Sequence, residues 1–149
     1  MIDSVDFAKY ILKTAEEKAL LMNQTKLQKI LYICNGTLLA LGKNVINENA
    51  RTWDYGPVYP KVYKWFQEHK ADDFSVLEIS KDIQTDNDIV KIVSQALDKF
   101  GKWTAKSLSE WSRKNGSPWA VIMEHNRRRL NSVISSNYIK LYFTGLLGV

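Results

Sequence analysis

Few residues in this chain have the types that catalysis or metal binding needs. The sequence contains one cysteine, Cys34, and two histidines, His69 and His125. A thiol beside a histidine can act as a nucleophile, and cysteines or histidines at short spacing can hold a metal ion. Neither a Cys-x-x-Cys nor a His-x-x-x-His spacing occurs, and the seven glycines are too scattered for a phosphate-binding loop. We therefore expect no catalytic residue, no metal and no cofactor, and a protein that is not an enzyme.

The helix expected to carry Cys34 gives that thiol a structural role. Thr25-Lys26-Leu27-Gln28 matches a capping box, in which Thr25 and Gln28 satisfy free backbone donors, and Gly42 is a plausible stop. Between them, one stripe at helical spacing holds Leu27, Ile30, Leu31, Cys34, Leu38 and Leu41. A cysteine on an apolar stripe is usually buried and inert.

The segment 51–60 is the most informative for binding. It reads Arg-Thr-Trp-Asp-Tyr-Gly-Pro-Val-Tyr-Pro and contains two of the chain's three prolines. Pro57 and Pro60 restrict the backbone and Gly56 permits unusual angles, so the segment presents its aromatic residues on a rigid course. The candidate partner-binding residues are Arg51, Trp53, Tyr55, Gly56, Pro57, Tyr59 and Tyr63, with Trp53, Tyr55 and Tyr59 as anchors. The same residues could instead build the central turn of the fold, and both interpretations stay open.

The periodicity predicts a mainly α protein, a single compact multi-helix domain over residues 1–149. Ser4, Thr25, Pro60, Thr85 or Asp86, Thr104, Ser117 and Ser135 or Ser136 are expected near helix starts. The pattern allows a short β-hairpin near residues 44–54, turning at Asn47-Glu48-Asn49. Residues 71–85 read as a loop around an extended piece at 74–79, and the helix that starts at Ser117-Pro118-Trp119 is expected to continue to Arg129.

Composition suits a globular protein that does not enter a membrane. Of 149 residues, 45% are hydrophobic and 25% charged, and the apolar stretches are too short for a membrane span. Asp3 and Asp6 stand where a secretory signal would place basic residues. A single cysteine fits a reducing compartment, so we expect a cytoplasmic location.

Charge is unevenly distributed along the chain. Residues 72–98 hold seven acids and two lysines, a net charge of −5, so the rest of the chain carries +10. The densest basic run is Arg127-Arg128-Arg129, at the end of an expected helix. This run could contact nucleic acid, but positive charge also suits the C-terminal end of a helix.

Three stretches, in this order, resemble a known family. The first is 25–32 (Thr-Lys-Leu-Gln-Lys-Ile-Leu-Tyr) followed by Gly36, Leu38-Leu39-Ala40 and Gly42; the second is 53–63 (Trp-Asp-Tyr-Gly-Pro-Val-Tyr-Pro-Lys-Val-Tyr); the third is Leu108-Ser109-Glu110 with Ser117-Pro118-Trp119. They are similar to the Panacea domain, the SocA-like antitoxin domain of phage-associated GepA-type proteins. The resemblance spans about residues 7–143.

The resemblance implies a mostly helical bacterial or prophage protein that acts as an antitoxin. Such domains neutralise a toxin encoded next door by direct contact, and the resemblance identifies neither that toxin nor the oligomeric state. Lys26, Gln28, Ser117, Pro118 and Trp119 are expected to be structural motif residues. Relatives often carry Thr-His before the Pro-Trp pair, whereas this chain has Ser112-Arg113. The alternative is a prophage-associated nucleic-acid-binding regulator.

Overall fold

The computed structural model describes residues 1–148 and shows a mainly helical chain with one small antiparallel hairpin. The elements are α1 (Ser4–Glu17), α2 (Gln24–Ala40), β1 (Arg51–Trp53), β2 (Gly56–Val58), α3 (Pro60–His69), the 3₁₀ helix η1 (Phe74–Val76), α4 (Lys81–Gln84), α5 (Asn87–Phe100), α6 (Ala105–Ser112), α7 (Pro118–His125) and α8 (Ser136–Leu147). The expected fold class is confirmed. No helix in residues 1–148 is long and apolar enough to cross a membrane.

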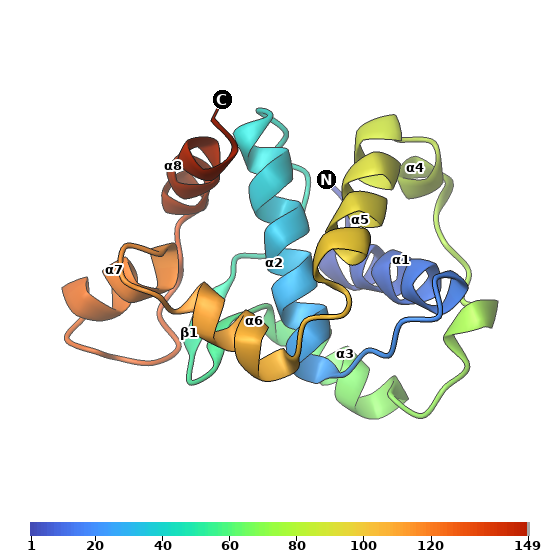
Figure 1. Cartoon of the computed structure of the whole chain (residues 1–149), viewed down its shortest axis with the longest axis horizontal. Coiled ribbons are helices and arrows are strands. Elements are labelled where there is room, and N and C mark those ends of the chain that lie inside the picture. Colours follow the sequence, from blue (N-terminus) through green and yellow to red (C-terminus); the bar gives the residue numbers. More distant parts are fainter. Residues whose placement is uncertain (149) are drawn as a thin grey trace.

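Helix α2 is the centre of the fold. It runs through the middle of the molecule, with α8 on one side and α5 and α1 on the other (Figure 1). Nearly every side chain from Leu27 to Leu39 is buried. Helix α8 packs closely because Gly36 has no side chain: a Cβ there would collide with the ring of Phe143. A helix that is buried on all sides needs neighbours on every face, which explains why α1, α5 and α8 surround α2.

Most helix starts follow the expected signals, with two shifts. The side chains of Asp86, Thr104, Ser117 and Ser135 accept backbone N–H bonds as N-caps. Helix α1 is capped by Asp3 rather than Ser4, and Ser4 is buried as its first residue. The capping box at Thr25 is wrong, because Asn23 caps α2 by accepting the Lys26 N–H at 2.9 Å. The side chain of Gln28 is thereby free to bond elsewhere.

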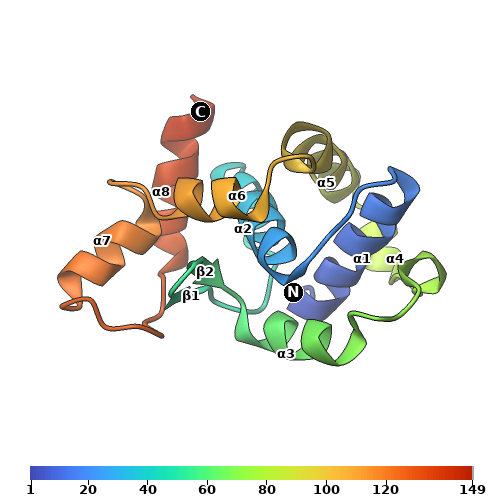
Figure 2. The same ribbon diagram turned by 60° about the horizontal axis from the view of Figure 1, so that its bottom comes forward.

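The hairpin lies later in the chain than the sequence suggested. Its strands pair Arg51 with Val58 and Trp53 with Gly56, so the turn is at Asp54-Tyr55 (Figure 2). The segment around Ile46 instead lies beside the N-terminus, where it forms an isolated parallel bridge with Ile2. A tertiary contact therefore holds that segment away from a turn at residues 47–49.

A strap of residues 127–134 crosses the hairpin after α7. The Thr52 N–H donates to the Ser132 carbonyl at 2.9 Å, and the Ile134 N–H donates to the Ala50 carbonyl at 2.8 Å. Arg127 and Arg128 have positive φ angles of 54° and 61°, which end the helix. The prediction of a helix up to Arg129 is therefore wrong, since α7 ends at His125.

The segment expected to be extended between residues 74 and 79 is helical over residues 74–76, whereas residues 77–79 belong to no helix. It contains η1 and is followed by the single-turn helix α4. Lys13 of α1 donates from Nζ to the Leu77 carbonyl at 2.8 Å, so this segment is fixed along α1 by a contact that is distant in the sequence.

Candidate partner-binding pocket beside the hairpin

A pocket of about 400 Å³ opens where the start of α2 meets the hairpin and α3. Its lining residues come from four parts of the chain: Gln24, Thr25, Gln28 and Lys29 from α2, Trp53, Asp54, Tyr55 and Val58 from the hairpin, Tyr63 from α3, and Leu130 from the strap. We call it the hairpin pocket. It brings together residues of the first two of the three sequence stretches that carried the family resemblance.

Three aromatic residues form the accessible wall of the hairpin pocket. Trp53 is half-buried and meets Tyr63 edge-on, with ring centroids 4.9 Å apart. The Trp53 Nε1–H donates to Asn131 Oδ1 at 3.2 Å, so the strap orients the indole. Tyr55, at the hairpin turn, is 68% exposed. Of the three anchors expected from the sequence, Trp53 and Tyr55 thus have side chains that a partner could reach.

The third expected anchor, Tyr59, lies in the core. Its side chain is 0% exposed, and its hydroxyl accepts a hydrogen bond from Asn35 Nδ2 at 2.9 Å. Burial raises the pKa of Tyr59, with the hydrogen bond from Asn35 acting in the opposite direction. The sequence suggested an exposed anchor because the segment is rich in aromatic residues. Tyr55, however, lies at the exposed hairpin turn, and four residues later the chain has entered the core at Tyr59. The prediction that Tyr59 is an exposed anchor is therefore wrong.

The remaining candidate binding residues shape the pocket rather than face a partner. Arg51 is half-buried and donates from Nη1 to the Asn131 carbonyl at 2.8 Å, which ties β1 to the strap. Gly56 and Pro57 are buried. Gly56 has a φ of +114°, and a Cβ there would collide with Ser112 Oγ and lie 3.1 Å from Lys29 Cε. Glycine is therefore required at this turn for both backbone and packing reasons.

Lys29 is a buried charged residue of this site to which the sequence pattern assigned no role. Its side chain is 1% exposed, lines the hairpin pocket, and donates from Nζ to the Pro57 carbonyl at 2.9 Å. Burial, together with a smaller effect of the nearby Arg113 guanidinium, lowers the pKa of Lys29 to about 7. A signal existed in the sequence: Lys29 is the one charged residue between Leu27 and Leu39, in a stretch that is otherwise uncharged and mostly apolar.

The expected structural motif residues join the pocket to the rest of the fold. Lys26 donates from Nζ to the Gly101 carbonyl at 2.6 Å. Ser117 caps α7 and Pro118 is its first residue. The buried Trp119 donates from Nε1 to the Trp53 carbonyl at 2.9 Å, so α7 holds the β1 end of the hairpin turn. The side chain of Gln28 accepts a hydrogen bond from the Tyr59 N–H.

The residues that could do catalytic chemistry are Cys34, His69 and His125, which belong to three different helices, α2, α3 and α7. Cys34 is 0% exposed, and burial raises its pKa. His69 Nδ1 lies 2.8 Å from the Trp65 carbonyl in α3, and the exposed His125 ends α7. Within the part of the chain that the structure describes, no group of three His, Cys, Asp or Glu side chains could hold a metal ion.

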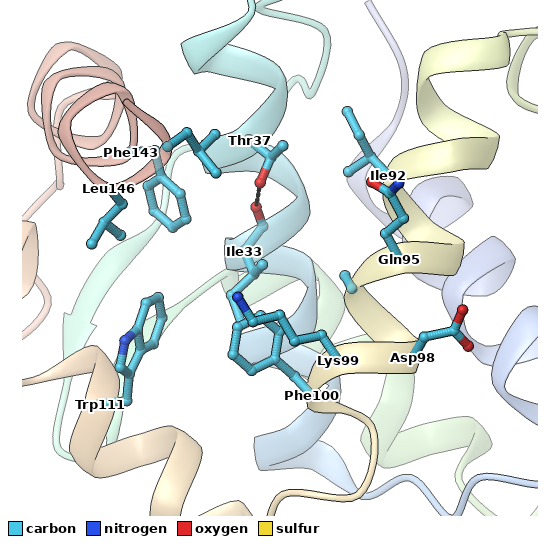
Figure 3. A pocket seen from close by; sticks show the side chains of 12 residues that line it. Ile33, Thr37, Ile92, Gln95, Asp98, Lys99, Phe100, Trp111, Phe143 and Leu146 are labelled. Atoms are coloured by element: carbon cyan, nitrogen blue, oxygen red, sulfur yellow. Dashed lines mark hydrogen bonds between the residues drawn. The ribbon is translucent and has the colours of Figure 1, made fainter. Parts of the chain in front are cut away.

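A second hollow of about 650 Å³ lies over α2, between α5 and α8 (Figure 3). Its lining is mostly apolar: Ile33, Thr37, Ile92, Gln95, Ala96, Asp98, Lys99, Phe100, Trp111, Phe143, Leu146 and Leu147. Two of its polar groups are engaged: the Thr37 hydroxyl donates to the Ile33 carbonyl, and Asp98 pairs with Lys18. Lys99 Nζ lies over the Phe100 ring, 5.3 Å from its centroid. We call this the α5–α8 groove.

Comparison with known proteins agrees with the resemblance of the sequence. Residues 27–120 match the family described as antitoxin SocA-like, Panacea domain. The chain is 30% identical over 132 residues to Antitoxin SocA of Caulobacter vibrioides (strain NA1000 / CB15N), a match that covers 81% of this chain and 70% of that protein. No solved structure matches. The matched region contains the hairpin, Lys29 and most of the pocket lining. The chain therefore belongs to the SocA-like family of Panacea-domain proteins.

Proposed function

We propose that this protein is the antitoxin of a toxin–antitoxin pair and neutralises its cognate toxin by direct protein–protein binding. The observation that carries this proposal is the accessible aromatic wall of Trp53, Tyr55 and Tyr63 inside the region that matches the antitoxin family. The name of the Caulobacter relative, Antitoxin SocA, supports the same role. The toxin is expected to be encoded by a neighbouring gene.

The hairpin pocket has properties that favour tight protein binding. Tryptophan and tyrosine contribute most to interface affinity where they surround a pocket that a partner can fill. The strap fixes Trp53 through Asn131 and fixes β1 through Thr52, so little conformational entropy is lost when a partner binds. Leu130, which is 44% exposed, extends the apolar surface across the mouth of the pocket. Masking of the toxin by this surface is the mechanism we favour.

A non-catalytic role is part of the proposal. The single cysteine, Cys34, is held in the core as a protonated thiol, which is not a nucleophile. The hydrogen-bonded position of His69 within α3 supports a structural role for that ring. Binding, rather than turnover of a substrate, is thus the activity that the described side chains suit.

Co-expression of the protein with the product of the adjacent gene tests the proposal. We expect the wild-type protein to restore growth to cells that express this product and to co-purify with it. Tyr55→Ala should lose both effects while the fold stays intact, because Tyr55 is largely exposed. Leu146→Ala, in the α5–α8 groove, is the matched control and should retain them. A harmless neighbour or the lack of a complex would refute the proposal. If Leu146→Ala lost binding and Tyr55→Ala kept it, the toxin interface would lie at the α5–α8 groove instead.

A nucleic-acid-binding regulator is the second candidate. The observation that favours it is the exposure of Arg127, Arg128 and Arg129. These residues lie after the end of α7, on a loop, so they do not form the exposed face of a recognition helix. An electrophoretic shift that weakens steeply between low and physiological salt would support this candidate.

A further inference from the structure

We propose that Lys29, at the floor of the hairpin pocket, forms an ion pair with a carboxylate side chain of the toxin, a glutamate or an aspartate that enters between Trp53, Tyr55 and Tyr63. This inference rests on the proposed function and specifies the chemistry of the partner at that site.

The first argument is the unused bonding capacity of Lys29. A protonated lysine has three N–H donors, and the Pro57 carbonyl accepts one of them at 2.9 Å. Lys29 has no other hydrogen bond and no ion pair within residues 1–148, although its side chain is 1% exposed. The other donors have no protein partner among the described residues, so a ligand that enters the pocket can accept hydrogen bonds from them.

The second argument is the charge around the pocket floor. The charged group that acts on Lys29 is Arg113, which directly follows the last residue of α6 and has the same sign. From the hairpin, Asp54 and Tyr55 also line the pocket, but both are exposed and Asp54 forms no ion pair with Lys29. On the α2 side, the neighbouring lining residues Thr25 and Gln28 are uncharged. A buried cation beside a second cation, with no counter-ion, favours an anionic ligand.

The third argument is shape. Gly56 carries no side chain, so the end of Lys29 can lie against the hairpin backbone: a Cβ at this position would be 3.1 Å from Lys29 Cε and 3.3 Å from Nζ. The rings of Trp53 and Tyr63 suit the methylene stem of an acidic side chain and exclude water, which strengthens an ion pair below them. The exposed Tyr55 and Leu130 give the surrounding protein surface a place to pack. A folded protein that presents a carboxylate therefore fits better than a free small acid.

A pH dependence follows from this arrangement. Because burial holds the pKa of Lys29 near 7 in the free protein, about half of the molecules carry a neutral amine at that pH. A bound carboxylate favours the protonated form and raises the pKa, so binding takes up a proton. The affinity is then highest below pH 7 and falls as the pH rises above it.

Titration calorimetry of the full chain with the adjacent gene's toxin at pH 6, 7, 8 and 9 tests the inference. We expect the wild-type Kd to rise by roughly tenfold or more between pH 7 and 9, in line with one linked proton. Lys29→Met should bind roughly tenfold more weakly at pH 7 and lose this dependence. Lys26→Met is the matched control, since Lys26 also donates to a backbone carbonyl but does not line the pocket; it should keep the wild-type pH profile.

The outcomes separate the two proposals. If the wild-type protein forms no complex at any pH, both the proposed function and this inference fail. If the complex forms, but its Kd does not change with pH and Lys29→Met binds as tightly as the wild type, only the ion pair is refuted. Lys29→Met could fail to fold, as a thermal melt would show. In that case a Kd that rises between pH 7 and 9 in both the wild type and Lys26→Met supports the ion pair, and a flat wild-type profile overturns it.

Discussion

The side chain of Gln28 bonds to both polar backbone groups of Tyr59. Gln28 Oε1 accepts the Tyr59 N–H at 2.8 Å, and Gln28 Nε2 donates to the Tyr59 carbonyl at 3.4 Å. All of these groups are buried. The amide thus replaces a neighbouring strand at the point where the chain leaves the hairpin and enters α3. The two motif stretches, 31 residues apart at this contact, form one structural unit.

Replacement of Gln28 should therefore destabilise the whole fold. Gln28→Leu keeps the approximate volume but leaves the Tyr59 N–H buried without an acceptor, which costs about 2 kcal/mol of unfolding free energy. Urea denaturation followed by circular dichroism measures this change. Gln95→Leu, at an exposed position of α5, is the control and should change stability by less than about 0.5 kcal/mol. Equal stability of the two variants would contradict the structural role of Gln28.

Tyr55 and Tyr59 should separate binding from folding, although they lie four residues apart. Tyr59→Ala removes a fully buried ring and is expected to cost about 4 kcal/mol of stability. Tyr55→Ala removes a mostly exposed ring and should cost less than about 0.5 kcal/mol while it weakens toxin binding. Thermal melts and pull-down of the toxin, both on the same preparations, distinguish the two effects. A large loss of stability in Tyr55→Ala would contradict the assignment of this side chain to the interface.

Gly56 should tolerate alanine far less well than Gly116 does. Both glycines have positive φ angles, +114° and +84°, but a Cβ at Gly56 would collide with Ser112 Oγ whereas one at Gly116 meets nothing within 4 Å. We expect Gly56→Ala to cost about 3 kcal/mol and Gly116→Ala about 1 kcal/mol. The double variant Gly56→Ala with Ser112→Ala should recover part of the difference, as chemical denaturation would show. No recovery would mean that backbone strain alone sets the cost.

Lys29 should make the stability of the free protein depend on pH. Its pKa in the folded chain, about 7, lies below the ordinary value of 10.5 that it regains on unfolding. Between these values the unfolded chain holds the additional proton, so the free energy of unfolding rises as the pH increases from 7 towards 10. Below pH 7 both states are protonated and the folded protein carries the full cost of a buried charge. Fluorescence-detected urea unfolding at several pH values should show this rise, of a few kcal/mol, in the wild type.

The difference between two variants isolates the contribution of Lys29. In Lys29→Met the rise above pH 7 should disappear. The difference in unfolding free energy between this variant and the wild type should therefore favour the variant more at pH 6 than at pH 10. In Lys26→Met, which keeps Lys29, the rise should remain. A wild type and Lys29→Met with parallel stability curves would show that the amine titrates at an ordinary pKa.

The local signals for helices were reliable because they act over a few residues. Thr104 and Ser117 cap helices as expected, since a side-chain oxygen two or three residues before a free N–H is enough to fix a helix start. Gly42 ends α2 with a φ of +82° for an equally local reason. The pattern could not distinguish Thr25 from Asn23 as the cap of α2, because both can accept a hydrogen bond and the choice depends on where the helix begins.

The positions of the hairpin and the strap could not be predicted from local sequence patterns. Residues 45–47 have the apolar and turn residues of a hairpin, yet the N-terminal Ile2 pairs with Ile46 and holds the segment extended. The run of arginines at 127–129 suits the end of a helix, yet the following residues pair with β1 and draw the chain out of the helix. In each case a partner distant in the sequence provides hydrogen bonds that no local pattern encodes.

The sequence by itself determined the helical class, most helix starts, the burial of Cys34 and the resemblance to antitoxins, because short-range periodicity and motif order carry this information. Only the tertiary structure decided which side chains of the aromatic segment are exposed and which are buried. It exposes Tyr55, buries Tyr59 against Gln28 and Asn35, and places Lys29 below a pocket whose walls come from three other parts of the chain. Exposure and desolvation depend on which elements meet around a side chain, and that is a property of packing.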